Sequence, residues 1–231
     1  MSIDFSKKSC LVFDAYGTLF NVDTSLDELS LLSADMKKML IDTWRAKQLQ
    51  YTWLRTLMNR YCSFQQVTEE ALAYALEQHQ IDYSEQIFDS FMRIYLEPEL
   101  TQGARELLEF LKVKNVTSAI LSNGTMHMLE RGVMKCGIEE LIGTLMSVEA
   151  ISEFKPSPAV YRMAQDQIES NKTRILFISG NPWDISGASN FGLDCVWINA
   201  GGKVRDKLPY GEVAEYESLG VLLQKLAQAL S

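Results

Sequence analysis

Short runs of apolar and β-branched residues alternate with helical repeats of apolar residues in the second half of this chain. The strands expected from this pattern are 116–122, 144–148, 174–179 and 193–198. The helices expected between them are 102–114, 126–136 and a segment that starts at Pro158. Buried strands that alternate with helices are typical of a parallel sheet covered on both faces.

Residues 26–96 follow a different pattern, in which only helices are expected. Apolar residues recur at close to helical spacing over residues 36–61, and the whole block contains no glycine. Thr68, followed by two acids, is expected to start a second helix, and Ser84 a third. The capping signal at Ser84 is partial, because Ile87 stands where a capping box has an acid or amide.

The helical block interrupts the α/β pattern, because an apolar strand precedes it and the other strands follow it. Glu97 and Pro98 mark its end. We therefore expect an α/β protein with a Rossmann-like three-layer core around a parallel sheet, plus an inserted all-helical cap. The predicted core comprises residues 1–21 and 97–231, and the predicted cap comprises residues 22–96.

Composition narrows the class of protein. Of the 231 residues, 47% are hydrophobic and 23% are charged, as in ordinary globular enzymes. The formal charge of −8 disfavours nucleic acid as a partner. No apolar run reaches the roughly 20 residues that cross a bilayer, and no signal-peptide pattern precedes the first strand. We expect no membrane contact.

The four cysteines lack the C-x-x-C spacing of a metal or redox motif. They are Cys10, Cys62, Cys136 and Cys195. Cys10 and Cys195 lie within apolar strand patterns, so we interpret the cysteines as reduced thiols of a cytoplasmic protein.

Polar residues follow the ends of several expected strands. In chain order they are Asp14, Thr18, Ser122, Asn123, Lys155 and Asp184. Taken singly, Ser122 with Asn123, Lys155 and Asp184 have simpler explanations as a helix start, a solvated loop lysine and an acid at a helix dipole, respectively. Ligands of open α/β sheets bind at the carboxyl ends of the strands, so the combination indicates a site.

The order Asp, Ser, Lys, Asp resembles the haloacid dehalogenase superfamily, whose nucleophile motif is D-x-D-G-T. Tyr16 stands where the magnesium-dependent phosphatases of that superfamily have their second Asp. Over nearly its whole length, the chain resembles the L-2-haloacid dehalogenases in particular. The blocks that carry the resemblance are FDAYGTLF, WRAKQLQYTWLRTLMNRY, ILSNG, KPSPAVY and GNPWD followed by SGASNFG.

Residues of the first reaction step can be assigned from their chemistry. Asp14 can attack as a carboxylate and form an ester. Thr18, Ser122 and backbone N–H groups can hold the substrate carboxylate or orient Asp14. Arg45 suits a departing halide, with Asn123 assisting, although alone it would be interpreted as a solvent-exposed helix arginine.

Lys155 and Asp184 form the expected machinery of the second step. The ammonium group keeps Asp14 ionised, and Asp184 orients Lys155 or takes a proton from water. The resemblance implies that this water attacks the ester and releases a 2-hydroxy acid of inverted configuration. Ser179 and Asn181 would position these groups or the water, and either could equally be an ordinary helix-starting residue.

The resemblance implies an apolar pocket around the substrate's side chain, which Tyr16, Leu49, Phe64 and Trp183 fit. Ala15 is also assigned to the substrate-binding residues. The resemblance also gives Tyr161 a supporting role similar to that of Ser179 and Asn181, and places it among the substrate-binding residues. Ala46 replaces a Gln that relatives often have, which is expected to change this pocket, and Gly180 replaces a Ser.

No cofactor or metal ion is expected, although Asp14 and Asp184 could still bind magnesium weakly. Tyr16 cannot act as the second acid, and Asn181 follows Gly180 where phosphatases usually have Gly-Asp. We predict metal-independent hydrolysis of short (S)-2-haloacids to (R)-2-hydroxy acids, with the haloacid and halide as partners. The alternatives are a magnesium-dependent phosphatase of the same superfamily and a non-catalytic binding protein. The resemblance implies a homodimer.

Overall fold

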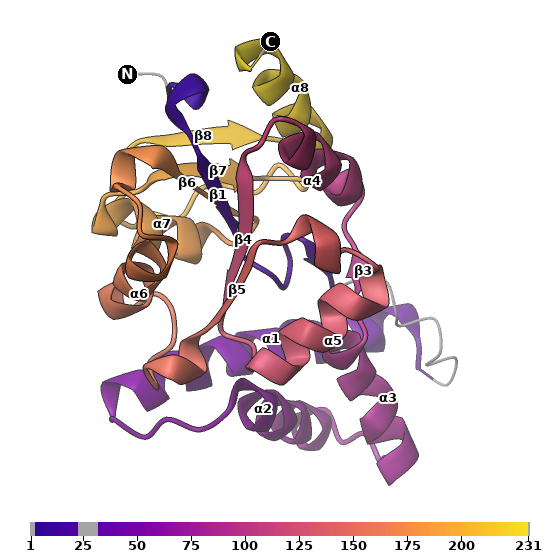
Figure 1. Cartoon of the computed structure of the whole chain (residues 1–231). Helices are drawn as coiled ribbons and strands as arrows, with labels where there is room; N and C mark the ends of the chain where they lie inside the picture. The colour runs from indigo at the N-terminus through magenta and orange to yellow at the C-terminus, as the bar shows by residue number, and fades with distance from the viewer. Residues whose placement is uncertain (1–2, 23–31, 231) are drawn as a thin grey trace.

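The computed structural model describes residues 3–22 and 32–230 and contains a six-stranded parallel sheet (Figure 1). In chain order the strands are β1 (Cys10–Phe13), β4 (Thr117–Ser122), β5 (Thr144–Ser147), β6 (Ile175–Ser179), β7 (Asp194–Ile198) and β8 (Val213–Tyr216). Their order in the sheet is β5-β4-β1-β6-β7-β8. The expected parallel sheet is confirmed, with β1 in its interior.

The register of the sheet decides where the nucleophile candidate lies. Phe13, the last residue of β1, pairs with Ile120 of β4 and Ile178 of β6. These strands are almost entirely buried, because helices cover both faces of the sheet. The next residue, Asp14, therefore stands at the edge where β4 and β6 also end.

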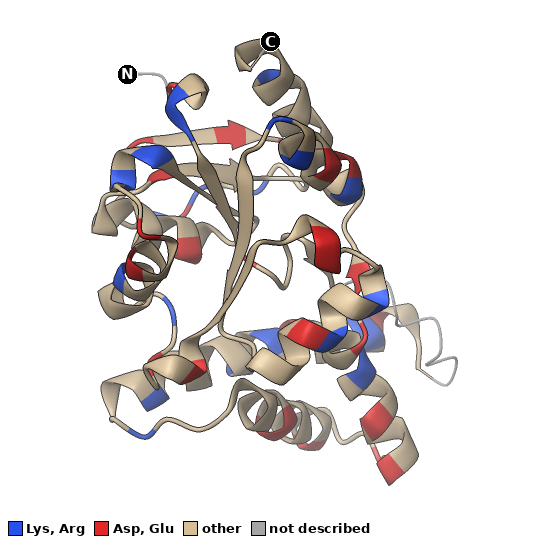
Figure 2. Cartoon of the chain, in the orientation of Figure 1, with Lys and Arg blue, Asp and Glu red and all other residues tan. Residues whose placement is uncertain are grey.

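Helices form the outer layers of the core (Figure 1). On one face lie α6 (Pro158–Ile168) and α7 (Pro182–Phe191). On the other face lie α4 (Ala104–Val113), α5 (Met126–Cys136) and α8 (Leu219–Ala229). Most charged residues lie on the helices and loops, whereas the sheet between them is nearly free of charge (Figure 2). The three-layer α/β core is therefore confirmed.

Three further helices lie across the carboxyl-terminal edge of the sheet (Figure 1). They are α1 (Ala34–Leu57), α2 (Phe64–Gln78) and α3 (Glu85–Leu96). The chain enters and leaves this block through β2 (Phe20–Asn21) and β3 (Glu99–Leu100), which pair antiparallel. The predicted helical insertion after the first strand is present, and the domain limits at 21/22 and 96/97 remain a prediction.

Serines start the three cap helices. Ser33, Ser63 and Ser84 each accept a hydrogen bond from the backbone N–H three residues later. The expected start of α2 at Thr68 is wrong, because its hydroxyl donates to the Phe64 carbonyl inside the helix. The third start, at Ser84, is confirmed.

The first cap helix is shorter than the predicted segment 36–61. It ends at Leu57, and Asn59 then adopts a left-handed conformation with φ +54°. The part of the helical prediction that falls on residues 23–31 lies outside the described residues.

Two C-terminal elements, β8 and α8, have no counterpart in the sequence predictions. β8 is a half-buried edge strand without a run of apolar residues. In α8, the side chains of Leu219, Leu222 and Leu226 are buried, and the helix packs on α4.

The four cysteines are free thiols, and Cys10 and Cys195 are buried, as expected. Within residues 3–22 and 32–230, no helix is both long enough and apolar enough to span a membrane.

Candidate active site

Hydrogen bonds hold both carboxylate oxygens of Asp14. Lys155 Nζ donates to Oδ1 at 2.9 Å. Three neutral side chains donate to Oδ2, namely Thr18 Oγ1 at 3.0 Å, Ser179 Oγ at 3.4 Å and Asn181 Nδ2 at 2.8 Å. Asp14 is only 5% exposed, so these donors replace the water that would otherwise solvate its charge.

Lys155 bridges two carboxylates. Its Nζ is also 2.9 Å from Asp184 Oδ2, and its side chain is buried, so it is not a solvated loop lysine. Burial lowers the pKa of Lys155, but the Asp14 and Asp184 carboxylates outweigh burial and hold that pKa above its ordinary value. Lys155 is therefore a fixed cation at neutral pH.

Asp184 lies in the first turn of α7 and is fully buried. Its Oδ1 accepts a hydrogen bond of 2.7 Å from Tyr161 Oη, and its Oδ2 accepts one from Lys155. Burial raises the pKa of Asp184 to about 6, Lys155 opposes the shift and Asp14 adds to it. Asp184 is ionised at neutral pH and takes up a proton just below it.

Tyr161 contacts Asp184 rather than the substrate cavity. It is fully buried, and its hydroxyl donates to both the side chain and the backbone carbonyl of Asp184. Burial and the nearby carboxylate raise the pKa of Tyr161, so the phenol remains a donor. This placement agrees with a supporting role at Asp184, and the assignment of Tyr161 to the substrate-binding residues stays a prediction, since it does not line the cavity beside Asp14.

Asn181 connects the nucleophile candidate to the cap. It precedes α7, but its side chain makes no capping hydrogen bond. Nδ2 donates to Asp14 and to the Tyr16 carbonyl, at 2.8 and 3.1 Å, and Oδ1 accepts from Arg45 Nη2 at 2.9 Å. A simple helix-starting role is thereby excluded for Asn181. Ser179 Oγ both accepts from the Asn181 N–H and donates to Asp14.

Arg45 reaches the site from α1 and passes close to Gly17, which in turn packs against Gly180. Gly17 has φ +82°, and a Cβ there would lie 2.9 Å from Arg45 Nη2. A Cβ on Gly180 would collide with the Gly17 carbonyl oxygen. Arg45 is half-buried and bonded to Asn181, so it is not simply a solvent-exposed helix arginine.

Ser122 and Asn123 do not cap the following helix. The N-cap of α5 is Thr125, whose side chain accepts a first-turn N–H. Ser122 Oγ accepts from the Gly124 N–H at 3.0 Å, and Asn123 Oδ1 accepts from the Lys155 N–H at 2.9 Å. The side-chain N–H groups of Asn123 are thus left to donate to an anion.

A cavity of about 30 Å³ lies beside Asp14, between core loops and cap helices. Its walls are Asp14, Tyr16, Arg45, Gln48, Leu49, Phe64, Ser122, Asn123, Asn181 and Trp183. The structure therefore brings together most of the residues assigned to the site. The side chain of Ala15 is fully buried and does not line the cavity, so its assignment to the substrate-binding residues stays a prediction.

Gln48 is the member of this lining without a predicted role. Its Nε2 donates to Thr68 Oγ1 at 2.8 Å, and its Oε1 accepts from Tyr95 Oη at 3.2 Å. Tyr16 Oη donates to the Tyr95 carbonyl, and burial raises the pKa of Tyr16, so its phenol stays a donor. These bonds join the three cap helices to the loop after β1. The sequence signal that could have assigned Gln48 to the site is its position one helical turn after Arg45, on the same face of α1.

Ala46 does not border the cavity. It lies on the exposed side of α1 and lines an outer hollow together with Trp53. The expectation that its small side chain changes the pocket is therefore not supported.

The donor set does not suit a metal ion. Among the residues that the structure describes, no group of three or more His, Cys, Asp and Glu side chains could hold one. The ammonium of Lys155 bridges Asp14 and Asp184, and Asn181 presents an N–H donor to Asp14, where a metal would need an acceptor.

A parallel α/β core with an inserted helical block, and a buried Asp–Lys–Asp arrangement at its strand ends, define a haloacid dehalogenase-like hydrolase. The chain matches that family over residues 8–192.

More similar proteins narrow the class. The (S)-2-haloacid dehalogenase 4A of Burkholderia cepacia is 37% identical over 201 residues, 85% of each chain. The (S)-2-haloacid dehalogenase of Pseudomonas sp. (strain YL) is 34% identical over 211 residues, 90% of this chain and 88% of its own. The L-2-haloacid dehalogenase of Xanthobacter autotrophicus with chloropropionic acid covalently bound has a TM-score of 0.85 and 28% identity, covering 95% of this chain and 98% of that one. The chain belongs to the (S)-2-haloacid dehalogenase family.

Proposed function

We propose that this protein hydrolyses short (S)-2-haloacids to (R)-2-hydroxy acids through an aspartyl ester, without a metal ion. The observation that carries the proposal is the setting of Asp14. Lys155 holds one of its oxygens, neutral donors hold the other, and Arg45 faces the same cavity from the cap. The covalently bound chloropropionic acid in the Xanthobacter autotrophicus relative supports it.

In the first step, an oxygen of Asp14 attacks C2 and the carbon–halogen electron pair leaves with the halide. Oδ1 suits this attack because it accepts one hydrogen bond, whereas Oδ2 accepts three. Thr18 orients the carboxylate, and Ser122 with nearby backbone N–H groups binds the substrate carboxylate. Arg45 and the Asn123 amide receive the halide. Attack opposite the halogen inverts C2.

In the second step, water attacks the ester carbonyl carbon of Asp14, and the bond from that carbon to the product oxygen breaks. Asp14 regains a carboxylate with one oxygen from water. One proton goes to the product oxygen, and the Lys155–Asp184 pair accepts the other. Asp184 can take part because its pKa, about 6, leaves it ionised at neutral pH. Ser179 and Tyr161 hold these groups in place.

A paired assay tests the function. We expect halide release from (S)-2-chloropropionate in the presence of excess chelator, and its loss in Asp14→Asn. Magnesium-dependent phosphate release from p-nitrophenyl phosphate, without halide release, would support the phosphatase alternative instead. Absence of both activities would support the binding-protein alternative.

We further propose that residues 22–96 act as a cap domain in a cytoplasmic homodimer with neither nucleic-acid nor membrane partners. The Arg45–Asn181 hydrogen bond supports the cap role, and four free cysteines support a reducing compartment. An apolar surface on α1 supports dimerisation, and its exposed side chains include Met39 and Leu54. Light scattering on the purified protein tests the dimer.

A further inference from the structure

A groove much larger than the catalytic cavity lies at the seam between cap and core. Its volume is about 830 Å³, within the range of small-molecule sites. The walls are mostly apolar and come from the end of α1, the segment before α6, and α6 and α7 themselves. Side chains that shape it are Trp53, Leu57, Phe154, Pro158, Trp183 and Leu208.

The catalytic cavity is much smaller than the groove, at about 30 Å³ against about 830 Å³. The two spaces are separated by a wall that a haloacid entering from the groove would have to pass. Trp183 is the residue that lines both the cavity and the groove. A second neighbouring hollow, which shares Arg45 with the cavity, measures only about 10 Å³.

Trp183 is held in place by ring contacts, and its indole N–H makes no hydrogen bond. Its indole packs edge-on against Trp53, with ring centroids 5.8 Å apart and an interplanar angle of 72°. Both indole N–H groups are buried, and neither has a hydrogen-bond partner. An unpaired buried donor is unfavourable, so turning the ring towards water breaks no hydrogen bond and relieves this penalty.

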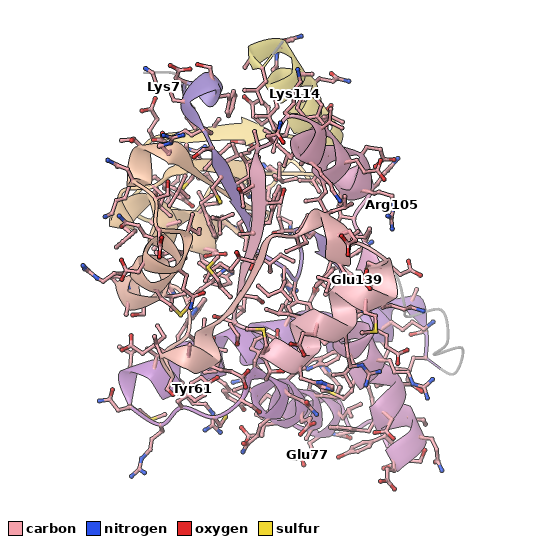
Figure 3. All side chains as sticks on the ribbon, viewed as in Figure 1. Lys7, Tyr61, Glu77, Arg105, Lys114 and Glu139 are labelled. Carbon is pink, nitrogen blue, oxygen red and sulfur yellow. The ribbon has the colours of Figure 1, made fainter. Side chains whose placement is uncertain are left out.

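A third unpaired donor lies at the same seam. Tyr61, labelled in Figure 3, follows α1, and its ring centroid is 4.9 Å from that of Phe154 in the groove wall. Its hydroxyl is buried without a partner. Within the described residues, the buried side-chain donors without a partner are these three. The Phe154 N–H donates to Thr56 Oγ1 of α1 at 3.0 Å across the seam, so it is the Trp183 ring, and not the seam as a whole, that no hydrogen bond restrains.

The charge of the groove suits a small organic anion. Arg162 and Lys172 line it, and no Asp or Glu does, on a chain whose formal charge is −8. Arg162 is exposed, and Lys172 Nζ lies 3.5 Å from the centroid of the Phe191 ring. Cations above apolar walls complement a carboxylate that carries a hydrocarbon substituent.

We propose that this groove is the access groove through which the 2-haloacid anion reaches Asp14, and that Trp183, packed against Trp53, is the gate between the groove and the catalytic cavity. The proposal rests on the dehalogenase function and adds an entry route and a selection by substrate size to it. When the Trp183 ring turns aside, the groove and the cavity join. A 2-haloacid with a longer hydrocarbon substituent then extends from C2 into the access groove.

Blocking the access groove tests whether the substrate enters through it. Leu208 is 48% exposed and lines the groove, so Leu208→Cys accepts a bulky methanethiosulfonate reagent there. We expect halide release from (S)-2-chloropropionate to be largely lost on labelling and restored by a thiol reductant. Val113→Cys, 78% exposed on α4 and outside the groove, is the matched control and should keep its activity when labelled.

The outcomes separate the two proposals. Unlabelled Leu208→Cys without halide release, together with inactive wild type, would refute the dehalogenase function. If Leu208→Cys is active and labelling does not reduce its halide release, the proposed access groove is refuted and the dehalogenase function is not. The wild type treated with the reagent reports any effect at the native cysteines.

The selection by substrate size is tested at Trp53, which lines the groove but not the catalytic cavity. Trp53→Ala removes the ring that packs against Trp183. We therefore expect kcat/KM for 2-bromohexanoate to rise about tenfold relative to kcat/KM for chloroacetate. Trp53→Phe keeps a ring and should shift this ratio less, and circular dichroism verifies that both variants fold. If folded Trp53→Ala has the same ratio of kcat/KM values for the two substrates as wild type, the proposed gate role of Trp183 is wrong.

Discussion

Arg45 of the cap donates a hydrogen bond of 2.9 Å to Asn181 of the core. The same amide donates to Asp14 at 2.8 Å, so a single side chain joins the cap to the nucleophile. The position of α1 over the sheet therefore fixes together the cation that we propose to bind the halide and the orientation of the carboxylate that we propose to attack. The first prediction follows from this connection.

Asn181→Ala removes the side-chain hydrogen bonds with Asp14, the Tyr16 carbonyl and Arg45 without adding charge. A hydrogen bond to a charged group contributes about 1.5–3 kcal/mol, so we expect kcat/KM for halide release to fall roughly 10–100-fold. Gln86→Ala, which removes an exposed amide on α3, is the control and should leave kcat/KM close to wild type. Equal values for Asn181→Ala and wild type would show that the connection is unimportant.

Lys155→Met leaves two buried carboxylates without their cation. We expect the free energy of unfolding at neutral pH to fall by about 3–5 kcal/mol, as measured by urea denaturation. Lys38→Met breaks only the exposed ion pair with Asp42 and should change stability by less than about 1 kcal/mol.

The stability deficit of Lys155→Met depends on pH in a defined direction. Asp184 has a folded-state pKa of about 6, above the ordinary 3.8, and loss of Lys155 removes an influence that lowers it. A carboxyl group with a raised folded pKa contributes stability below its unfolded pKa, which is lost as pH rises through the folded value. The deficit should therefore be small near pH 4 and grow through pH 6 and above. A deficit that is constant over this range would contradict the assignment.

Tyr161→Phe tests the control of Asp184 by its phenol neighbour. The Tyr161 hydrogen bond lowers the pKa of Asp184, so its loss should move the acid limb of kcat/KM from about pH 6 to higher pH. The expected shift is about 0.5–1 unit, which corresponds to one hydrogen bond. Tyr210→Phe is the control, because Tyr210 donates to the Pro182 carbonyl at the start of the same helix. If both variants shift the limb equally, the effect is not specific to Asp184.

Gly180→Ala should lower stability because its Cβ would meet the Gly17 carbonyl, which is backbone and cannot move aside alone. We expect a loss of about 1–3 kcal/mol in the free energy of unfolding. Activity should fall as well, since the Gly180 N–H donates to Thr18 Oγ1, which orients Asp14. In Gly201→Ala the nearest atoms belong to the Lys203 side chain at 3.7 Å, so this control should behave like wild type.

The core could be predicted from the sequence because its strands are buried on both faces and therefore appear as continuous apolar runs. β8 carries no such signal, since it is an edge strand with only half-buried residues. In the cap, the start of α2 was misplaced because Thr68 resembles a capping residue, whereas it forms a hydrogen bond with Gln48 inside the cap.

The site was predictable where chemistry and chain order coincide, as for Asp14, Lys155 and Asp184. The positions of Gln48 and Tyr161 depend on how helices pack against one another, which a single sequence does not encode locally. Trp183 could be assigned to an apolar pocket, but its position between two spaces is visible only when the folded walls are seen together.

The short antiparallel pair of β2 and β3 has a consequence for how such proteins diversify. Asn21 lies opposite Glu99, so the helical block leaves the core and returns to it at the same point. A tight turn between these two residues would close the chain without interrupting β1, after which Asp14 follows. We therefore expect that the helical insert can be exchanged without rebuilding the sheet, with a change of the cavity wall that Arg45 and Leu49 now form.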